Sequence, residues 1–161
     1  MKKIFISSFL FSVVTILHAQ QFGQLYKLTA TDGAAGNQLG SAMAVNGNYA
    51  VVAASDVSFG QVQNSCQCVY VFEKTNGNWI QKQKLLPGDN TSGFGHAVAI
   101  SRNYIIVGAP GDENNAGAVY VFLRNANGNW VQEKKIVASD RSAGDLFGTS
   151  VSITPVYDHG D

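Results

Sequence analysis

The chain has 161 residues with 11 basic and 11 acidic side chains, so its formal net charge is zero. Charged residues make up only 14% of the sequence, which excludes the strong basic surface that nucleic acid or an anionic membrane would require. Hydrophobic residues make up 45%, enough for a packed core, so a disordered chain is also excluded. Many glycines and few prolines, 17 against 3, indicate a turn-rich β protein.

The N-terminal segment has the pattern of a secretory signal. Lys2 and Lys3 precede an apolar run over residues 4–17. This run is shorter than the ~20 apolar residues that a membrane-spanning helix needs. We therefore predict a cleaved signal peptide over residues 1–19 and no membrane span afterwards. The mature part, residues 20–161, would be secreted, or lie in the periplasm or on the cell surface.

Two cysteines, Cys66 and Cys68, follow in the first half of the mature chain. An oxidising compartment permits a disulfide between them. In an extended strand, however, Cα atoms two residues apart approach the ~7 Å limit for a disulfide. We favour two small, half-buried, unpaired residues at the start of a strand, with a local disulfide as the alternative. Two ligands are too few for a zinc site.

The mature chain repeats itself with a period of about 50 residues. Gly40 and Tyr49 recur as Gly95 and Tyr104, and the sequence Val-Tyr-Val-Phe and the sequence Asn-Gly-Asn-Trp each occur twice. A third copy begins at Phe147 but loses its apolar residues before the chain ends. The repeat predicts three units, whose approximate limits are 26–83, 84–134 and 135–161, the last of them partial.

Each complete unit is expected to contain four strands. In the second unit these are predicted at 95–100, 104–108, 118–123 and 129–135. Asn-Gly pairs between the third and fourth strands are strong hairpin signals, because both residues tolerate a positive φ. A further strand is predicted at 149–153. The fold class is therefore all-β, made of tandem four-stranded antiparallel β-propeller-type blades, two complete and a third partial.

The residues of the second unit resemble a known family. Phe94 and Gly95, followed by the Gly-Ala-Pro of residues 108–110, look like the FG-GAP repeat of the integrin α-subunit β-propeller and its bacterial relatives. The first unit departs from this pattern, with Leu39 in place of Phe and Ala-Ala-Ser at 53–55 in place of Gly-Ala-Pro. The resemblance implies an exported module for binding or adhesion.

The resemblance also implies calcium, because some blades of the family carry an acidic calcium loop. Calcium takes six to eight oxygen ligands, so closely spaced carboxylates are needed. In the loop over residues 111–117, Asp112 and Asn114 occupy alternate positions, but Ala116 stands at the third. Asp112 and Asn114 are therefore candidate calcium ligands, and a solvated turn is the alternative.

A second acidic series consists of Asp32, Asp89 and Asp140, one before each unit's first strand. Their recurrence within one chain indicates a shared structural task, for example capping a turn in the blade-to-blade connection. A role in ligand binding is the alternative.

The sequence contains no motif typical of a catalytic site, and we expect no enzyme activity. We predict an exported module that contacts a protein or glycan partner through its blade loops. The alternative is a truncated structural propeller segment of a larger exported protein or of a glycan-processing enzyme. Because propellers close with about four to eight blades, we also expect self-assembly or additional blades.

Overall fold

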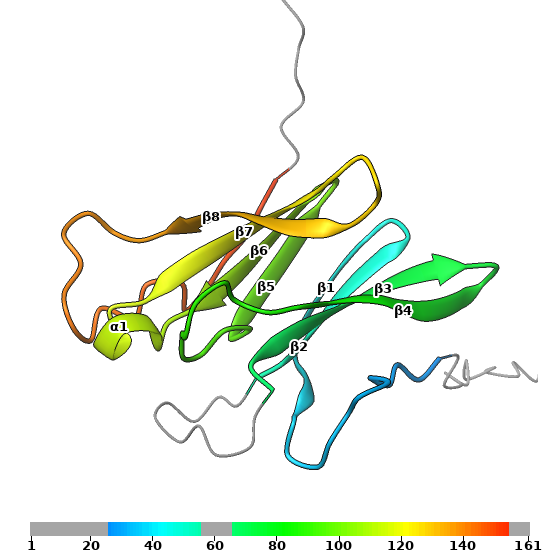
Figure 1. The fold of residues 1–161 in the computed structure, drawn as a ribbon, viewed down its shortest axis with the longest axis horizontal. Coiled ribbons are helices and arrows are strands. Elements are labelled where there is room, and N and C mark those ends of the chain that lie inside the picture. Colours follow the sequence, from blue (N-terminus) through cyan, green and yellow to red (C-terminus); the bar gives the residue numbers. More distant parts are fainter. Residues whose placement is uncertain (1–25, 56–65, 155–161) are drawn as a thin grey trace, which may run out of the picture.

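The computed structural model describes residues 26–55 and 66–154 (Figure 1). They form two antiparallel four-stranded sheets in which neighbouring strands follow one another along the chain. We call the first sheet blade 1 and the second blade 2. The predicted all-β fold of propeller-type blades is confirmed for these two sheets. Within the described residues, no helix is long and apolar enough to cross a membrane.

The strands of the two blades have matching lengths and order. Blade 1 contains β1 (Leu39–Asn46), β2 (Tyr49–Ala54), β3 (Cys68–Thr75) and β4 (Asn78–Leu85). Blade 2 contains β5 (Ala97–Ser101), β6 (Tyr104–Ala109), β7 (Ala118–Arg124) and β8 (Trp130–Ile136). A short turn, α1 (Asp112–Asn115), lies between β6 and β7, and its Glu113 and Asn114 have positive φ values of 41° and 56°. The four strands predicted in the second unit agree with β5 to β8 within two residues at each end.

The strand predicted at 149–153 is wrong. These residues form no strand. Among the described residues, the start of the third unit joins blade 2 through a bridge between Gly117 and Phe147 and through backbone N–H groups of Leu146 and Phe147, which donate to the loop before β7. An extended segment becomes a strand by exchanging backbone hydrogen bonds with a neighbour. Segment 149–153 has no such neighbour among the described residues.

The described long connections lie at the same end of the sheets (Figure 1). Because each blade runs up and down in antiparallel order, the link between its second and third strands and the link to the next blade emerge together. We call this end the loop face, and its described connections are 86–96, 110–117 and 137–147. The short hairpin turns lie at the opposite end.

The main core fills the space between the two blades. One face of β2 and β3 packs against the aromatic residues of blade 2, and this shared cluster includes Val51, Val69, Val71, Phe94, Ile105, Val107, Tyr120, Phe122 and Trp130. Phe94 is completely buried and lies edge-on to Tyr120 and Phe122, with ring centroids 5.4 and 6.1 Å away. Phe94 therefore fills the centre of the junction between the blades.

The outer strands β4 and β8 are also joined. The side-chain amide of Gln83 donates to the carbonyl oxygen of Trp130 at 2.6 Å and accepts from its backbone N–H at 2.8 Å. The Trp130 ring in turn meets the edge of Tyr49, with centroids 6.0 Å apart. These contacts satisfy backbone groups at the junction as well as burying apolar surface.

Gly95 allows the first strand of blade 2 to approach blade 1 closely. Its φ is +92°, and a Cβ there would lie 3.3 Å from the Cβ atoms of Ala53 and Ser55. Gly40 occupies the same place in blade 1 with a φ of +101°, but a Cβ there would have no atom within 4 Å. The two glycines thus share one backbone conformation, but a neighbouring blade covers the glycine of blade 2 and leaves the glycine of blade 1 open.

The side chains that follow these glycines show the same contrast. Met43 and Val45 of β1 are 64% and 60% exposed. Their counterparts in β5 are Val98, which packs against the shared core, and Ile100, which is 7% exposed within it. We call the surface formed by Gly40, Met43 and Val45 the open face of blade 1.

Candidate functional site

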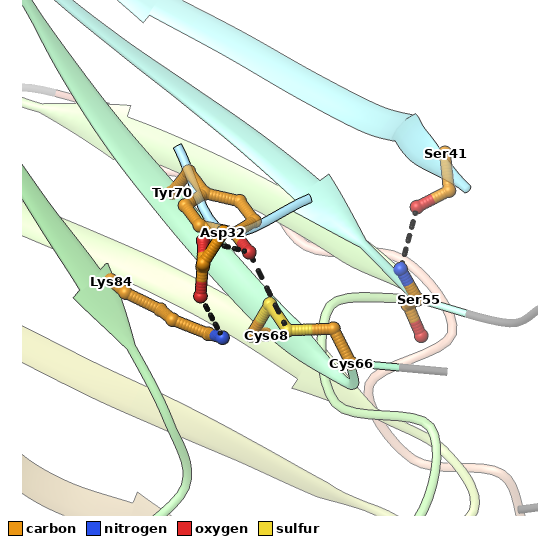
Figure 2. The surroundings of a disulfide bond; sticks show 7 residues. All are labelled: Asp32, Ser41, Ser55, Cys66, Cys68, Tyr70 and Lys84. Atoms are coloured by element: carbon orange, nitrogen blue, oxygen red, sulfur yellow. Dashed lines mark hydrogen bonds and ion pairs between the residues drawn. A yellow bond between two sulfur atoms is a disulfide. The ribbon is translucent and has the colours of Figure 1, made fainter. Parts of the chain in front are cut away.

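Blade 1 contains a three-residue polar cluster beside the cysteines (Figure 2). The hydroxyl of Tyr70 donates to Oδ1 of Asp32 at 2.9 Å, and the ammonium of Lys84 donates to Oδ2 at 2.6 Å. Tyr70 is buried, whereas the Asp32 side chain is 48% exposed. The cluster ties the segment that enters the blade to its third and fourth strands, and we call it the clamp of blade 1.

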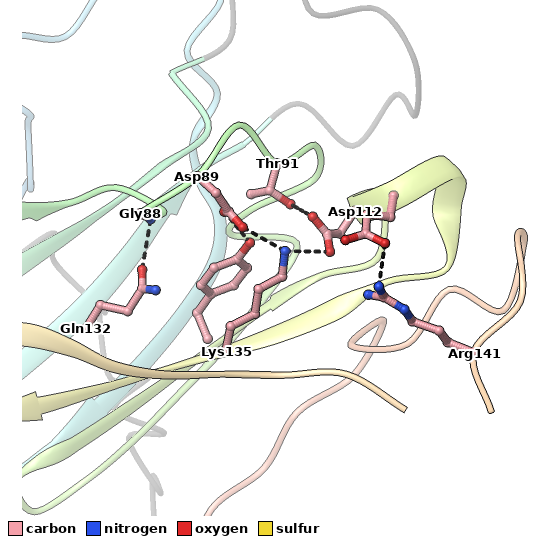
Figure 3. A network of polar contacts seen from close by, with 9 residues as sticks. Gly88, Asp89, Thr91, Asp112, Gln132, Lys135 and Arg141 are labelled. Atoms are coloured by element: carbon pink, nitrogen blue, oxygen red, sulfur yellow. Dashed lines mark hydrogen bonds and ion pairs between the residues drawn. The ribbon is translucent and has the colours of Figure 1, made fainter. Parts of the chain in front are cut away.

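Blade 2 repeats the clamp at equivalent positions (Figure 3). Tyr120 donates its hydroxyl proton to Oδ1 of Asp89 at 2.6 Å, and Lys135 donates to Oδ2 at 2.7 Å. Here the lysine has a second carboxylate, because Oδ2 of Asp112 lies 2.8 Å from its ammonium. Oδ1 of Asp112 accepts from the hydroxyl of Thr91 at 2.6 Å.

A shared irregularity of the sheets positions both lysines. The pairing of the third and fourth strands shifts register opposite residues 71–72 in blade 1 and 121–122 in blade 2, as a β-bulge does. Beyond the bulge, Lys84 and Lys135 lie directly across from the clamp tyrosines. The aspartate then reaches both groups from the connection that enters the blade.

The charges of blade 2 stabilise one another. Burial, followed by the hydrogen bond to Asp89, raises the pKa of Tyr120 to about 12, so its hydroxyl stays protonated at neutral pH. Burial alone would lower the pKa of Lys135, but bonds to Asp112, Asp89 and Tyr120 outweigh it and raise that pKa. For Asp89, burial raises the pKa, and the bonds from Lys135 and Tyr120 outweigh this and lower it. The lysine and Asp89 are therefore both charged.

The structural task expected for the aspartate series is met by Asp32 and Asp89, whose partners are a tyrosine and a lysine. Sequence reasoning identified the aspartates and missed those partners. The signal was present, because Tyr70 and Tyr120 occupy the same place in the repeated Val-Tyr-Val-Phe sequence. What was missing was the bulge, without which the lysine would face the other side of the sheet.

The two candidate calcium ligands lie in different surroundings. Asp112 is 3% exposed and contacts Thr91 and Lys135, whereas Asn114 is exposed on α1. The ammonium of Lys135 lies between the carboxylates of Asp112 and Asp89, so a calcium ion at Asp112 would compete with it. No group of three or more His, Cys, Asp or Glu residues within 26–55 and 66–154 could hold a metal ion. Calcium binding by Asp112 and Asn114 stays a prediction.

An open cleft lies on the loop face beside the clamp of blade 2. Its lining residues come from the segment just before β3 and from the connection between the blades, and they are Cys66, Gln67, Leu86, Pro87, Asp89, Asn90, Thr91 and Ser92. The cleft therefore brings together a cysteine, a clamp carboxylate and two apolar side chains at the junction of two blades.

Cys66 and Cys68 form a disulfide, so the expectation of two unpaired cysteines is wrong. The expectation assumed an extended backbone between them. Gln67 instead has a φ of +40°, which turns the chain and shortens the Cα–Cα distance of the cysteines to 5.1 Å. This distance lies well inside the range that disulfides span.

The repeat found in the sequence and in the fold corresponds to a known family. The sequence model described as FG-GAP repeat matches residues 22–72, 79–122 and 130–155. The chain belongs to the FG-GAP repeat family. The resemblance seen in the second unit is thereby confirmed, and it extends to the first unit, where Leu39 replaces the phenylalanine. A comparison with curated proteins found no match.

Proposed function

We propose that this FG-GAP repeat chain is an exported binding module that contacts its partner through the loop face and performs no catalysis. The observation that carries the proposal is the gathering of all described long connections at one end of two four-stranded blades (Figure 1). Binding sites are commonly built from loops that a rigid scaffold positions. Export rests on residues 1–19, which lie outside the described residues.

A protein partner fits the loop face better than a glycan does. Glycans usually pack on exposed aromatic rings, since these offer a flat apolar surface with a polar rim. On the described connections of the loop face, Phe94 is buried and Phe147 is 37% exposed. The cleft offers Leu86 beside polar side chains, which is the mixed character of a protein-binding surface. The titratable groups at the cleft bind one another, which favours a structural role for them over a catalytic one.

Screening the protein against arrays of extracellular proteins and of glycans tests this function. We expect a protein ligand, and we expect Leu86→Arg to weaken its binding about tenfold or more, as loss of a contact at the centre of an interface does. Ile80→Arg is the control, because Ile80 is similarly exposed but lies on β4, away from the cleft. Equal losses in both variants, a glycan ligand or no ligand would contradict the proposal.

We further propose that a second copy of the chain covers the open face of blade 1. Within the molecule, the matching surface of blade 2 is covered by the Val51 and Val71 side of blade 1. The face of blade 2 that corresponds to the Val51 and Val71 side of blade 1 includes the half-buried Ile106 and Val121. Copies joined through these two different surfaces would associate head to tail.

We expect the chain to associate as its concentration rises, and Met43→Lys to shift it toward the monomer, because a charge would be buried in the contact. Light scattering and sedimentation measure the mass. Ile80→Lys is the control for a charge placed on another exposed apolar residue. A monomer at all concentrations would contradict this assembly.

A further inference from the structure

The disulfide of blade 1 is accessible from one side only. Cys66 is half-buried and lines the cleft, whereas Cys68 is completely buried in the apolar cluster of β2 and β3. A thiol that enters the cleft can therefore approach the sulfur of Cys66 and not that of Cys68. Disulfide exchange depends on which sulfur is within reach of the attacking thiolate.

This disulfide contributes little as a staple of the fold. The stabilisation expected from a disulfide grows with the length of the loop it closes. Cys66 and Cys68 are separated by one residue, so they close one of the shortest loops that a disulfide can form. Its effect is local and falls on the residue between the two cysteines.

Comparison of the two blades shows what that effect is. Cys68 pairs with Ala54 in blade 1 as Ala118 pairs with Ala109 in blade 2, so Gln67 corresponds to Gly117. Both have a positive φ, +40° for Gln67 and +88° for Gly117. Glycine adopts this conformation readily, and glutamine does not. Blade 1 thus places a non-glycine residue in the left-handed region between two bonded cysteines.

The conformation of Gln67 serves a contact between the blades. Its side-chain oxygen accepts the backbone N–H of Gly93 at 2.9 Å. Gly93 directly precedes Phe94, the residue at the centre of the junction. The disulfide, Gln67 and the start of blade 2 form a continuous chain of contacts along the cleft.

We propose that the Cys66–Cys68 disulfide is an exchange site for small thiols that enter the cleft, and that only its oxidised form keeps Gln67 bonded to Gly93. In the first step a thiolate attacks Sγ of Cys66, the bond to Cys68 breaks, and Cys68 takes up a proton to become a thiol. A second thiolate then attacks the sulfur of the bound small thiol. This step releases a small disulfide and leaves Cys66 reduced.

A neighbouring hydroxyl fits the reduced state. The hydroxyl of Tyr70 lies 3.7 Å from Sγ of Cys66 and is held by Asp32 (Figure 2). Burial, followed by the bond to Asp32, raises the pKa of Tyr70, so the hydroxyl keeps its proton. It can turn that proton toward the sulfur when Cys66 becomes a thiolate.

Reduced glutathione is the probe for the exchange reaction. Under native conditions we expect it to reduce the disulfide while the near-ultraviolet circular dichroism spectrum persists, with both new thiols detected by alkylation and mass spectrometry. In single-cysteine variants, oxidised glutathione should modify Cys66 in Cys68→Ser about tenfold faster than Cys68 in Cys66→Ser. Reduction that occurs only in denaturant, or equal rates in two folded variants, would overturn the proposal. The reduction by glutathione is measured on the unaltered protein and needs no variant.

Amide hydrogen exchange tests the link to Gln67. After reduction we expect the N–H of Gly93 to exchange faster, because its acceptor is released. The N–H of Gly88 is the internal control, since it donates to the side chain of Gln132 at 2.8 Å and lies on the same connection (Figure 3). Unchanged exchange at Gly93, or equal acceleration at both glycines, would overturn this part of the proposal.

Discussion

Replacing Lys135 by methionine is expected to reduce the free energy of unfolding by about 3 kcal/mol, because it leaves a buried carboxylate without its countercharge. The Asp112 side chain is 4% exposed and has the Lys135 ammonium 2.8 Å away. Thr91 would remain as its neutral partner. A hydroxyl cannot replace the ammonium, since the cost of burying the charge remains.

Blade 1 supplies the matched control for this substitution. Lys84 has the same tyrosine and aspartate partners, but its carboxylate, Asp32, is 48% exposed and no second carboxylate is present in the clamp. Lys84→Met should therefore cost less than about 1 kcal/mol. Urea unfolding at neutral pH measures both variants. Asp112→Asn should restore much of the loss in Lys135→Met, and equal losses in the two lysine variants would disprove the buried-charge explanation.

Replacing Phe94 by alanine is expected to cost about 3–5 kcal/mol, the range for a large aromatic residue removed from a core. Phe94 has no exposed surface and contacts the rings of Tyr120 and Phe122. The cavity would lie at the junction of the two blades. The contacts between them should therefore weaken together with the packing of blade 2.

Leu39 is the counterpart of Phe94 in blade 1 and again gives the control. It is half-buried, with no preceding blade packed around it in the described structure, so Leu39→Ala should cost about 1–2 kcal/mol. Phe94→Leu, which conserves most of the volume, should cost less than about 1.5 kcal/mol. Urea unfolding again provides the measurement. A Phe94→Ala loss no larger than that of Leu39→Ala would show that the junction is not the main core.

The order of the strands could be predicted from the sequence because strands and hairpin turns each have a local sequence signal. The apolar pattern of each strand and the Asn-Gly pairs at the hairpins depend only on neighbouring residues. Because the sequence repeats, the strands predicted in one unit supported those predicted in the other. The strand predicted at 149–153 is wrong because an apolar pattern shows only that a segment can form a strand. Its backbone hydrogen bonds depend on a partner strand elsewhere in the chain.

The candidate site was less predictable, because its geometry depends on irregular backbone. The bulge that brings Lys135 to Tyr120 and the left-handed residue Gln67 both depart from regular strand geometry. Asp112 is a calcium candidate because of the family resemblance and its spacing from Asn114, and neither reveals that a lysine from β8 faces the same carboxylate. Contacts of this kind join positions far apart in the chain and leave no local pattern.

The strands β1 and β5 differ in whether a preceding blade packs on them, and this difference affects how the molecule unfolds. Each blade ties its entering segment to its third and fourth strands with a clamp. One face of β5 is covered by the preceding blade, whereas the corresponding face of β1 carries the exposed Met43 and Val45. Cooperative folding then depends on contacts between neighbouring blades, as in other repeat arrays. β5 is therefore more deeply buried than β1. Opening of the native state should therefore begin at β1, and the junction should be the last part to unfold.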